Sequence, residues 1–125
     1  PWDMLVSLYK YFQINKTISL PKDGGPEFKP FLLNRINESS PSVSCYSNYY
    51  SDGDDILLDF IGKFENIQTD FNKICDKIGI PNQKLPHKNA TKHKHYTEYY
   101  DNETRKIVAK KYAHDIEYFG YKFGE

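Results

Sequence analysis

Ile56-Leu57-Leu58-Asp59-Phe60-Ile61-Gly62-Lys63-Phe64-Glu65-Asn66 is the stretch of the sequence that decides the fold. Its first six residues are apolar except for Asp59, and such a nearly continuous run is typical of a β-strand buried on both faces. Asn66 can cap a helix that begins directly after it. A strand followed so closely by a helix predicts α/β architecture.

The helix expected after Asn66 is the best-marked element of the chain. Asp70 lies near its positive end, and Gly79 followed by Pro81 ends it. Helical spacing relates its apolar residues, which are Ile67, Phe71, Ile74, Cys75 and Ile78.

The rest of the chain predicts three more helices and one more strand. Trp2 to Ile14 is apolar on nearly every face, which is typical of a helix buried on several sides. The further elements are a helix at residues 28–37, a strand at 43–50, a hairpin turn at 51–54, and a helix that is capped by Asp101 and ends at Gly120.

Composition limits the classes of function. The 125 residues make one domain or part of one, and 17 basic residues balance 17 acidic ones, so no overall field favours a nucleic-acid partner. No apolar run reaches the roughly 18–20 residues of a membrane span.

Cys45 and Cys75 form no CxxC pair and are expected to be core thiols. Because the first residue is Pro1 and not Met, we expect a fragment, with any targeting segment upstream.

The sequence opens with Pro1-Trp2-Asp3-Met4-Leu5-Val6-Ser7-Leu8-Tyr9. A lone serine in an apolar helix is usually structural, with its hydroxyl bonded to the carbonyl one turn back. This opening, however, resembles the 3′-phosphate-binding motif of sulfotransferases, in which an Arg at a strand end is followed by Pro and, farther along the helix, by Ser-x-Tyr. Ser7 and Tyr9 match that pair, and the Arg would fall just upstream of Pro1. The resemblance implies that the Ser7 hydroxyl binds the 3′-phosphate of 3′-phosphoadenosine 5′-phosphosulfate (PAPS).

Two further blocks resemble the same family. Residues 59–66 look like the D-F-I-G-[RK]-[FY]-E-N strand-to-helix turn of the carbohydrate sulfotransferases. There Lys63 and Glu65 are expected to be structural, as a local ion pair or as helix-entry groups. The tail resembles the closing helix of the family, which ends in D-I-x-x-F-G-Y, and it is expected to dock onto the sheet. The matching residues are Asp115-Ile116 and Phe119-Gly120-Tyr121.

A basic segment lies between these blocks: Leu85-Pro86-His87-Lys88-Asn89-Ala90-Thr91-Lys92-His93-Lys94-His95. A charge run of this kind is normally a solvated loop. It also resembles the family's L-P-H-x-N-x-[ST] stretch, and in sulfotransferases a basic loop at this place in the order wraps the 3′-phosphate and the adenosine. The resemblance therefore implies that Asn89, Thr91 and Lys92 bind the cofactor together with Ser7.

Three weaker signals predict no separate site. His87, His93 and His95 lack a Cys or carboxylate to complete a zinc shell, so no metal is expected. Gly24-Gly25 is not followed by the Gly-Lys-Ser/Thr of a phosphate-binding loop. Asp52-Gly53-Asp54-Asp55 lacks the spacing of a calcium loop.

The matched blocks run from Pro1 to Phe123. The resemblance implies a P-loop-like three-layer sandwich around a mostly parallel sheet, of which residues 1–125 supply the C-terminal portion. It implies transfer of a sulfuryl group from PAPS to a hydroxyl, expected to be that of a carbohydrate. The phosphate-binding loop and the catalytic base would lie upstream of Pro1. No catalytic residue is therefore assigned, and the chain alone is expected to be inactive.

Two alternatives stay open: a non-catalytic α/β binding or assembly module on the same scaffold, and a fragment of a P-loop kinase. A truncated sheet would leave an apolar face exposed, so self-association into a homo-oligomer is expected. The bias toward Asn, Lys and Ile indicates an AT-rich microbial or viral genome and a cytoplasmic location, with the Golgi lumen as the alternative.

Overall fold

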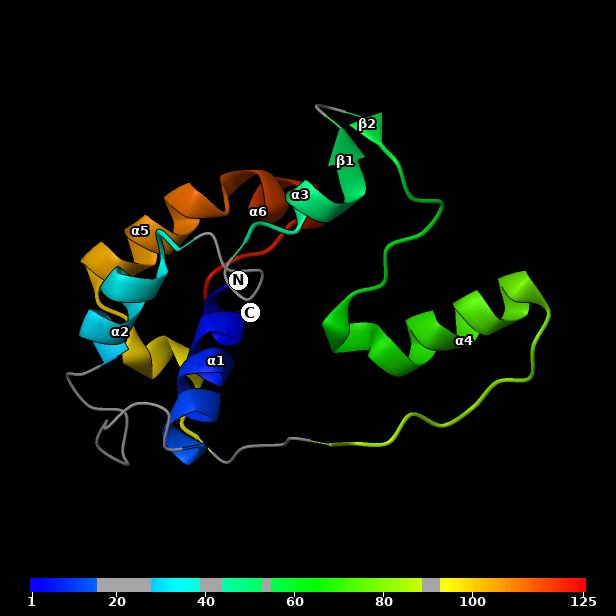
Figure 1. The fold of residues 1–125 in the computed structure, drawn as a ribbon, viewed down its shortest axis with the longest axis horizontal. Coiled ribbons are helices and arrows are strands. Elements are labelled where there is room, and N and C mark those ends of the chain that lie inside the picture. Colours follow the sequence, from blue (N-terminus) through cyan, green and yellow to red (C-terminus); the bar gives the residue numbers. More distant parts are fainter. Residues whose placement is uncertain (16–27, 39–43, 53–54, 89–92) are drawn as a thin grey trace. The chain divides into compact units, whose positions relative to one another are not determined.

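The computed structural model describes residues 1–15, 28–38, 44–52, 55–88 and 93–125, which are arranged in two compact units. The first unit combines Pro1–Tyr49 with Thr91–Glu125, and the second unit is Tyr50–Ala90. Figure 1 labels the helices and strands. In chain order the elements are α1 (Trp2–Ile14), α2 (Phe28–Arg35), α3 (Ser47–Tyr50), β1 (Ser51–Asp52), β2 (Asp55–Ile56), the 3₁₀ helix η2 (Phe64–Asn66), α4 (Ile67–Ile78), the 3₁₀ helix η3 (Tyr96–Tyr99), α5 (Asn102–Lys111) and α6 (Ala113–Phe119).

The core of the first unit is built around α1. This helix has the bounds that its apolar residues predict, and it buries side chains on more than one side. Helix α2 is also confirmed, and it ends at Arg35, two residues before the predicted end. The buried core residues of these helices and their partners are Trp2, Leu5, Val6, Tyr9, Phe28, Phe31, Leu32, Ile36, Tyr96, Val108 and Tyr112. Aromatic residues make up 16% of the chain. Many of them lie in this one core, in which rings from different helices pack against each other.

The C-terminal helix begins and ends where its capping residues predict, but it is interrupted. The Asp101 carboxylate accepts a hydrogen bond from the Thr104 backbone N–H at 2.7 Å, and the Asp101 N–H donates to the Thr104 hydroxyl at 3.0 Å. Gly120 ends the segment in the left-handed conformation with φ of 69°. Between them, Tyr112 leaves helical geometry (φ −101°, ψ 25°) and separates α5 from α6.

The tail docks onto the opening helix. The Trp2 indole N–H donates to the Arg105 carbonyl at 3.3 Å, and the Tyr100 hydroxyl donates to the Trp2 carbonyl at 2.9 Å. The rings of Trp2 and Phe123 meet edge to face with centroids 5.5 Å apart, so the two ends of the chain lie close together, as Figure 1 shows. We predicted docking onto a sheet. Within the described residues the tail docks onto α1 instead.

The strand predicted at residues 43–50 is wrong where the structure describes it, because Ser47–Tyr50 forms the short helix α3. The cause lies far away in the sequence. The buried carboxylate of Asp115 accepts hydrogen bonds from the backbone N–H groups of Tyr46 at 2.7 Å and Ser47 at 2.9 Å. Those two donors open the helical turn, and a carboxylate that accepts from them stabilises the turn as an N-terminal cap would.

The second unit contains the hairpin and α4. Strands β1 and β2 pair antiparallel, with Ser51 opposite Ile56 and Asp52 opposite Asp55. A hairpin therefore forms near the predicted place, but Ser51 and Asp52, which we predicted to be part of its turn, belong to β1, and residues 53–54 lie outside the described residues. Helix α4 follows Asn66 as expected, although the Asn66 side chain makes no capping hydrogen bond. Gly79 ends α4 with φ of 76°, which confirms the predicted stop.

The strand predicted from Ile56 onward is wrong in extent, because β2 ends at Ile56. Residues 57–63 form neither helix nor strand, and Leu57 and Leu58 are 66% and 49% exposed. The Leu57 backbone N–H donates to the Tyr50 carbonyl at 2.8 Å, but no further strand among the described residues lies beside the chain that follows, so the ladder ends there.

The described residues thus form an α/β protein that is mostly helical, with one antiparallel two-stranded sheet. A parallel sheet is not among them. None of the described helices is both long enough and apolar enough to span a membrane.

Candidate functional site

The Ser7 side chain lies on the exposed side of α1. Asp3 and Tyr11, one turn before and one turn after it, are exposed too, so the three form a polar stripe along the helix. In the part of the chain that the structure describes, the Ser7 hydroxyl forms no hydrogen bond, and the bond to a carbonyl one turn back that a structural serine makes is not observed there. The hydroxyl is therefore available to a ligand.

Tyr9, the second residue of the Ser-x-Tyr pair, faces the opposite way and is fully buried. Its ring packs against Phe28, Phe31 and Tyr99 at centroid distances of 5.3, 5.2 and 6.3 Å. These contacts fix the rotation of α1 about its axis. The two residues therefore have different roles: Tyr9 packs α1 against the core, and Ser7 lies exposed to solvent.

The other three predicted cofactor-binding residues, Asn89, Thr91 and Lys92, lie outside the described residues. The flank that follows them is described and is well anchored. The His93 ring lies 6.3 Å from the Tyr99 ring, and the His95 ring packs on Tyr96 at 4.7 Å. His95 Nδ1 is also 2.7 Å from the Thr97 hydroxyl. The basic segment therefore runs directly into η3, which packs against α1, the helix that carries Ser7.

Lys10 is a cation that the sequence analysis missed. It lies three residues after Ser7 on α1, and only 8% of it is exposed. Its ammonium group is 5.5 Å from the ring centroids of both Tyr9 and Tyr99, and it donates to Gln13 Oε1 at 3.0 Å. The only hint in the sequence was a lysine on a mostly apolar helix.

The turn at residues 59–66 closes onto the start of α4. The Lys63 backbone N–H donates to Asp70 Oδ2 at 2.9 Å, and the Lys73 ammonium lies 2.7 Å from Asp70 Oδ1. The hydrogen bond from Lys73, followed by the one from the Lys63 backbone, lowers the pKa of Asp70. A Cβ atom at Gly62 would lie 3.1 Å from the Asp70 Cβ, so the close approach favours glycine. The contact with Asp70 uses the Lys63 backbone, so the structural roles expected for the Lys63 and Glu65 side chains stay predictions.

A shallow hollow of about 370 Å³ lies beside this turn, within the second unit. Its lining is mostly apolar and includes Phe64, Ile67 and Ile74. Asp70 also lines it, but both of its carboxylate oxygens are already engaged. The hollow therefore lacks the convergent polar groups that fix a small ligand.

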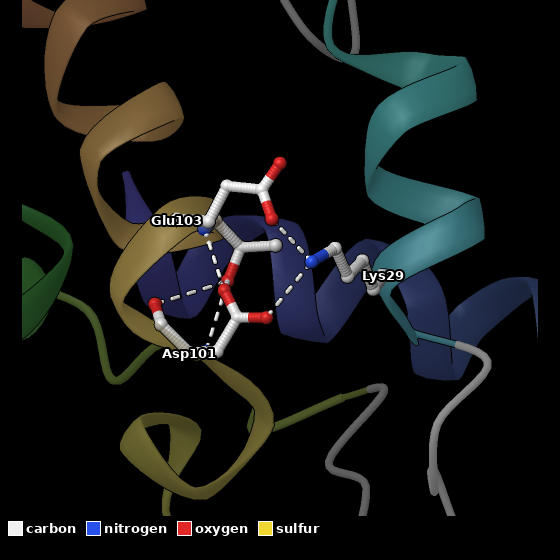
Figure 2. Close-up of polar contacts among 4 residues, drawn as sticks. Lys29, Asp101 and Glu103 are labelled. Carbon is white, nitrogen blue, oxygen red and sulfur yellow. Dashed lines mark hydrogen bonds and ion pairs between the residues drawn. The ribbon is translucent and has the colours of Figure 1, made fainter.

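A charged cluster joins α2 to the start of α5 (Figure 2). The Lys29 ammonium lies 3.1 Å from Asp101 Oδ2 and 2.5 Å from Glu103 Oε2. Hydrogen bonds to Glu103 and then to Asp101 raise the pKa of Lys29. The pKa of Asp101 is lowered, mainly by the Thr104 backbone N–H. The three groups satisfy one another at the surface, so we assign them a structural role.

The histidines of the basic segment do not gather into a metal site within the described residues, where no group of three or more His, Cys, Asp or Glu side chains could hold an ion. Both cysteines are free thiols, with Cys75 buried and Cys45 half-buried. The Cys45 thiol donates to the Lys111 carbonyl at 3.2 Å, and burial raises its pKa. A raised pKa disfavours the reactive thiolate, which agrees with a structural thiol.

Comparison with known proteins decides the family. The model of the sulfotransferase family matches residues 6–122, which is nearly the whole chain. The chain belongs to the sulfotransferase family. It is also 28% identical over 88 residues to an uncharacterized protein from Archaeoglobus fulgidus, an alignment that covers 66% of this chain and 64% of that protein. No solved structure matches the chain significantly.

The match to the sulfotransferase family takes in Ser7, the 59–66 turn and the closing helix as one stretch. Two of these three blocks are structural: Asp70 holds the turn, and Asp115 holds the segment that contains Tyr46. Only the first block presents an exposed hydroxyl without a hydrogen-bond partner among the described residues. Ser7 is accordingly the candidate ligand-binding residue of this sulfotransferase chain.

Proposed function

We propose that the protein transfers a sulfuryl group from PAPS to a hydroxyl group of a carbohydrate, and that the Ser7 hydroxyl binds the 3′-phosphate of the nucleotide. Membership of the sulfotransferase family supports the reaction class. The similarity of residues 59–66 to the turn of carbohydrate sulfotransferases supports the acceptor class. The observation that carries the assignment of Ser7 is its exposed hydroxyl, which no described residue binds, on a helix held in place by Tyr9.

Asn89, Thr91 and Lys92 are proposed as the remaining donors to the 3′-phosphate and the adenosine. An amide, a hydroxyl and an ammonium together suit a dianionic phosphate. The anchoring of the following residue, His93, at η3 supports this proposal, because η3 packs against the helix that carries Ser7.

The reaction is an in-line displacement at sulfur. The acceptor oxygen forms a bond to the sulfur as the bond between sulfur and the 5′-phosphate oxygen breaks. A base takes the proton of the acceptor, and cations stabilise the charge on the transferring group. The products are a sulfate ester and 3′-phosphoadenosine 5′-phosphate (PAP).

We further propose that residues 1–125 are the C-terminal portion of one sulfotransferase domain, a P-loop-like sandwich whose phosphate-binding loop and base precede Pro1. The exposed apolar residues after Ile56, which belong to no strand among the described residues, support this arrangement. The 125-residue chain alone would then be inactive. The proposed location is the cytoplasm, for a microbial or viral protein, with the Golgi lumen as the alternative.

The test is the affinity of the full-length protein for PAP, measured by titration calorimetry. Ser7→Ala is expected to weaken binding about 10- to 100-fold, because a hydrogen bond to a charged group contributes roughly 1.5–3 kcal/mol. Thr69→Ala is the matched control, since Thr69 is an exposed hydroxyl on α4 in the second unit. Equal affinities of Ser7→Ala and the unchanged protein would overturn the role of Ser7.

The exposed apolar side chains of the second unit favour a second candidate, a non-catalytic assembly module that forms homo-oligomers. Its sign would be no affinity for PAP in the full-length protein. A P-loop kinase would instead require magnesium and a nucleoside triphosphate.

A further inference from the structure

Lys10 is buried to an extent that is unusual for lysine. It is 8% exposed, whereas lysine is almost never fully buried unless it is paired. It lies on the side of α1 that packs against η3, and Ser7 lies one helical turn before it. The cost of burying this charge raises the question of what the residue does.

Lys10 contacts side chains on its own helix and on η3. Its ammonium group lies over two rings, those of Tyr9 on its own helix and Tyr99 on η3, at 5.5 Å from each centroid. It donates to Gln13 Oε1 at 3.0 Å, and Gln13 Nε2 in turn donates to the Tyr9 hydroxyl at 2.9 Å. A desolvated cation between two aromatic rings is a directional contact that joins the two elements.

Tyr99 also contacts the end of the basic segment. Its ring lies 6.3 Å from the His93 ring. Burial raises the pKa of the Tyr99 hydroxyl, and a hydrogen bond with the Lys94 backbone opposes this rise only in part. Lys10 is thus connected through one ring to the place where the chain leaves the basic segment.

We propose that Lys10 is a positioning residue of the nucleotide site: by joining α1 to Tyr99, it fixes His93 and the end of the basic segment relative to Ser7. It acts through Tyr99 and does not touch the nucleotide. This inference rests on the proposed function, because it assumes that Ser7 and the basic segment bind the same 3′-phosphate.

The experiment compares two nucleotides, PAP and adenosine 5′-monophosphate, which lacks the 3′-phosphate. Lys10→Met in the full-length protein keeps much of the side-chain volume and removes the charge. We expect it to weaken PAP binding about 5- to 10-fold, the size of one desolvated cation–π contact, and to leave the monophosphate affinity unchanged. Lys10→Arg should restore PAP binding, because a guanidinium also stacks on aromatic rings.

Lys29→Met is the matched control, since it removes a lysine that bridges Asp101 and Glu103 at the surface. It should leave both affinities unchanged. If Lys10→Met does not fold, Gln13→Met removes one hydrogen-bond acceptor of the ammonium group and should weaken PAP binding in the same selective way. Equal losses for the two nucleotides, or no loss for PAP, would overturn the inference. If Ser7→Ala also keeps full PAP affinity, the proposed function itself fails.

Discussion

The two units of the molecule differ in how far they bury their apolar side chains. In the first unit Phe28 is 1% exposed and lies among Tyr9, Tyr99 and Tyr100. In the second unit Phe64 is 77% exposed and Leu57 is 66% exposed. Both units are rich in apolar residues, but only the first packs most of them into one core.

The difference shows that apolar spacing identifies a helix without identifying what covers it. Helices α1, α2 and α5 supply surfaces to one another, so their apolar residues form a core. Helix α4 has equally regular spacing, yet Ile67 and Ile78 are exposed and Cys75 is buried. Apolar surface of this kind is typical of a region that packs against further protein.

The largest expected effect tests this contrast directly. Phe28→Ala removes a ring from the aromatic core and should lower the free energy of unfolding by about 3–5 kcal/mol. Phe64→Ala, the same change at an exposed site, should alter it by less than about 0.5 kcal/mol. Urea denaturation of the two variants provides the measurement. Similar losses for both would show that the second unit has a core of its own around Phe64.

A smaller effect is expected at Asp115, the residue that turns part of the predicted strand into a helix. Asp115→Ala would remove the buried carboxylate that accepts from the backbone N–H groups of Tyr46 and Ser47, at a cost of roughly 1–3 kcal/mol in unfolding free energy. Circular dichroism during thermal unfolding would detect the loss, with the exposed Asp59→Ala as control. An unchanged midpoint would contradict the role given to Asp115.

The smallest effect concerns the charge at Asp101. Its pKa is lowered in the folded protein, so its stabilising contribution is present above the unfolded pKa of about 3.9 and is lost as the pH falls through the folded value. Asp101→Asn keeps a good capping side chain but removes the charge. The unfolding midpoint of this variant should therefore fall less steeply below about pH 4 than that of the unchanged protein. A pH dependence identical to the unchanged protein would mean that Asp101 contributes nothing through its charge.

Local signals predicted most of the helices correctly. The apolar run of α1, the helix-ending glycines Gly79 and Gly120, and the cap at Asp101 all act within a few residues, and the structure confirms each of them. The strand at 43–50 could not be rejected from the sequence, because the carboxylate that caps α3 lies 68 residues farther along the chain at Asp115. The end of β2 at Ile56 likewise depends on neighbouring strands and not on the apolar residues that follow it.

For the candidate site, the sequence predicted Ser7, and the structure adds that its hydroxyl is exposed and bonds to none of the residues that the structure describes. Lys10 was missed because a lysine in a mostly apolar helix is only a weak sign of burial. Its importance appears only when Tyr99, 89 residues farther along, is seen beside it.

The most direct test of the account is a crystal structure of the full-length protein with PAP bound, in which the distance from the Ser7 hydroxyl oxygen to the 3′-phosphate oxygens is measured. The account predicts a hydrogen bond of about 2.5–3.0 Å. A 3′-phosphate bound elsewhere, with the Ser7 hydroxyl facing only solvent, would contradict it.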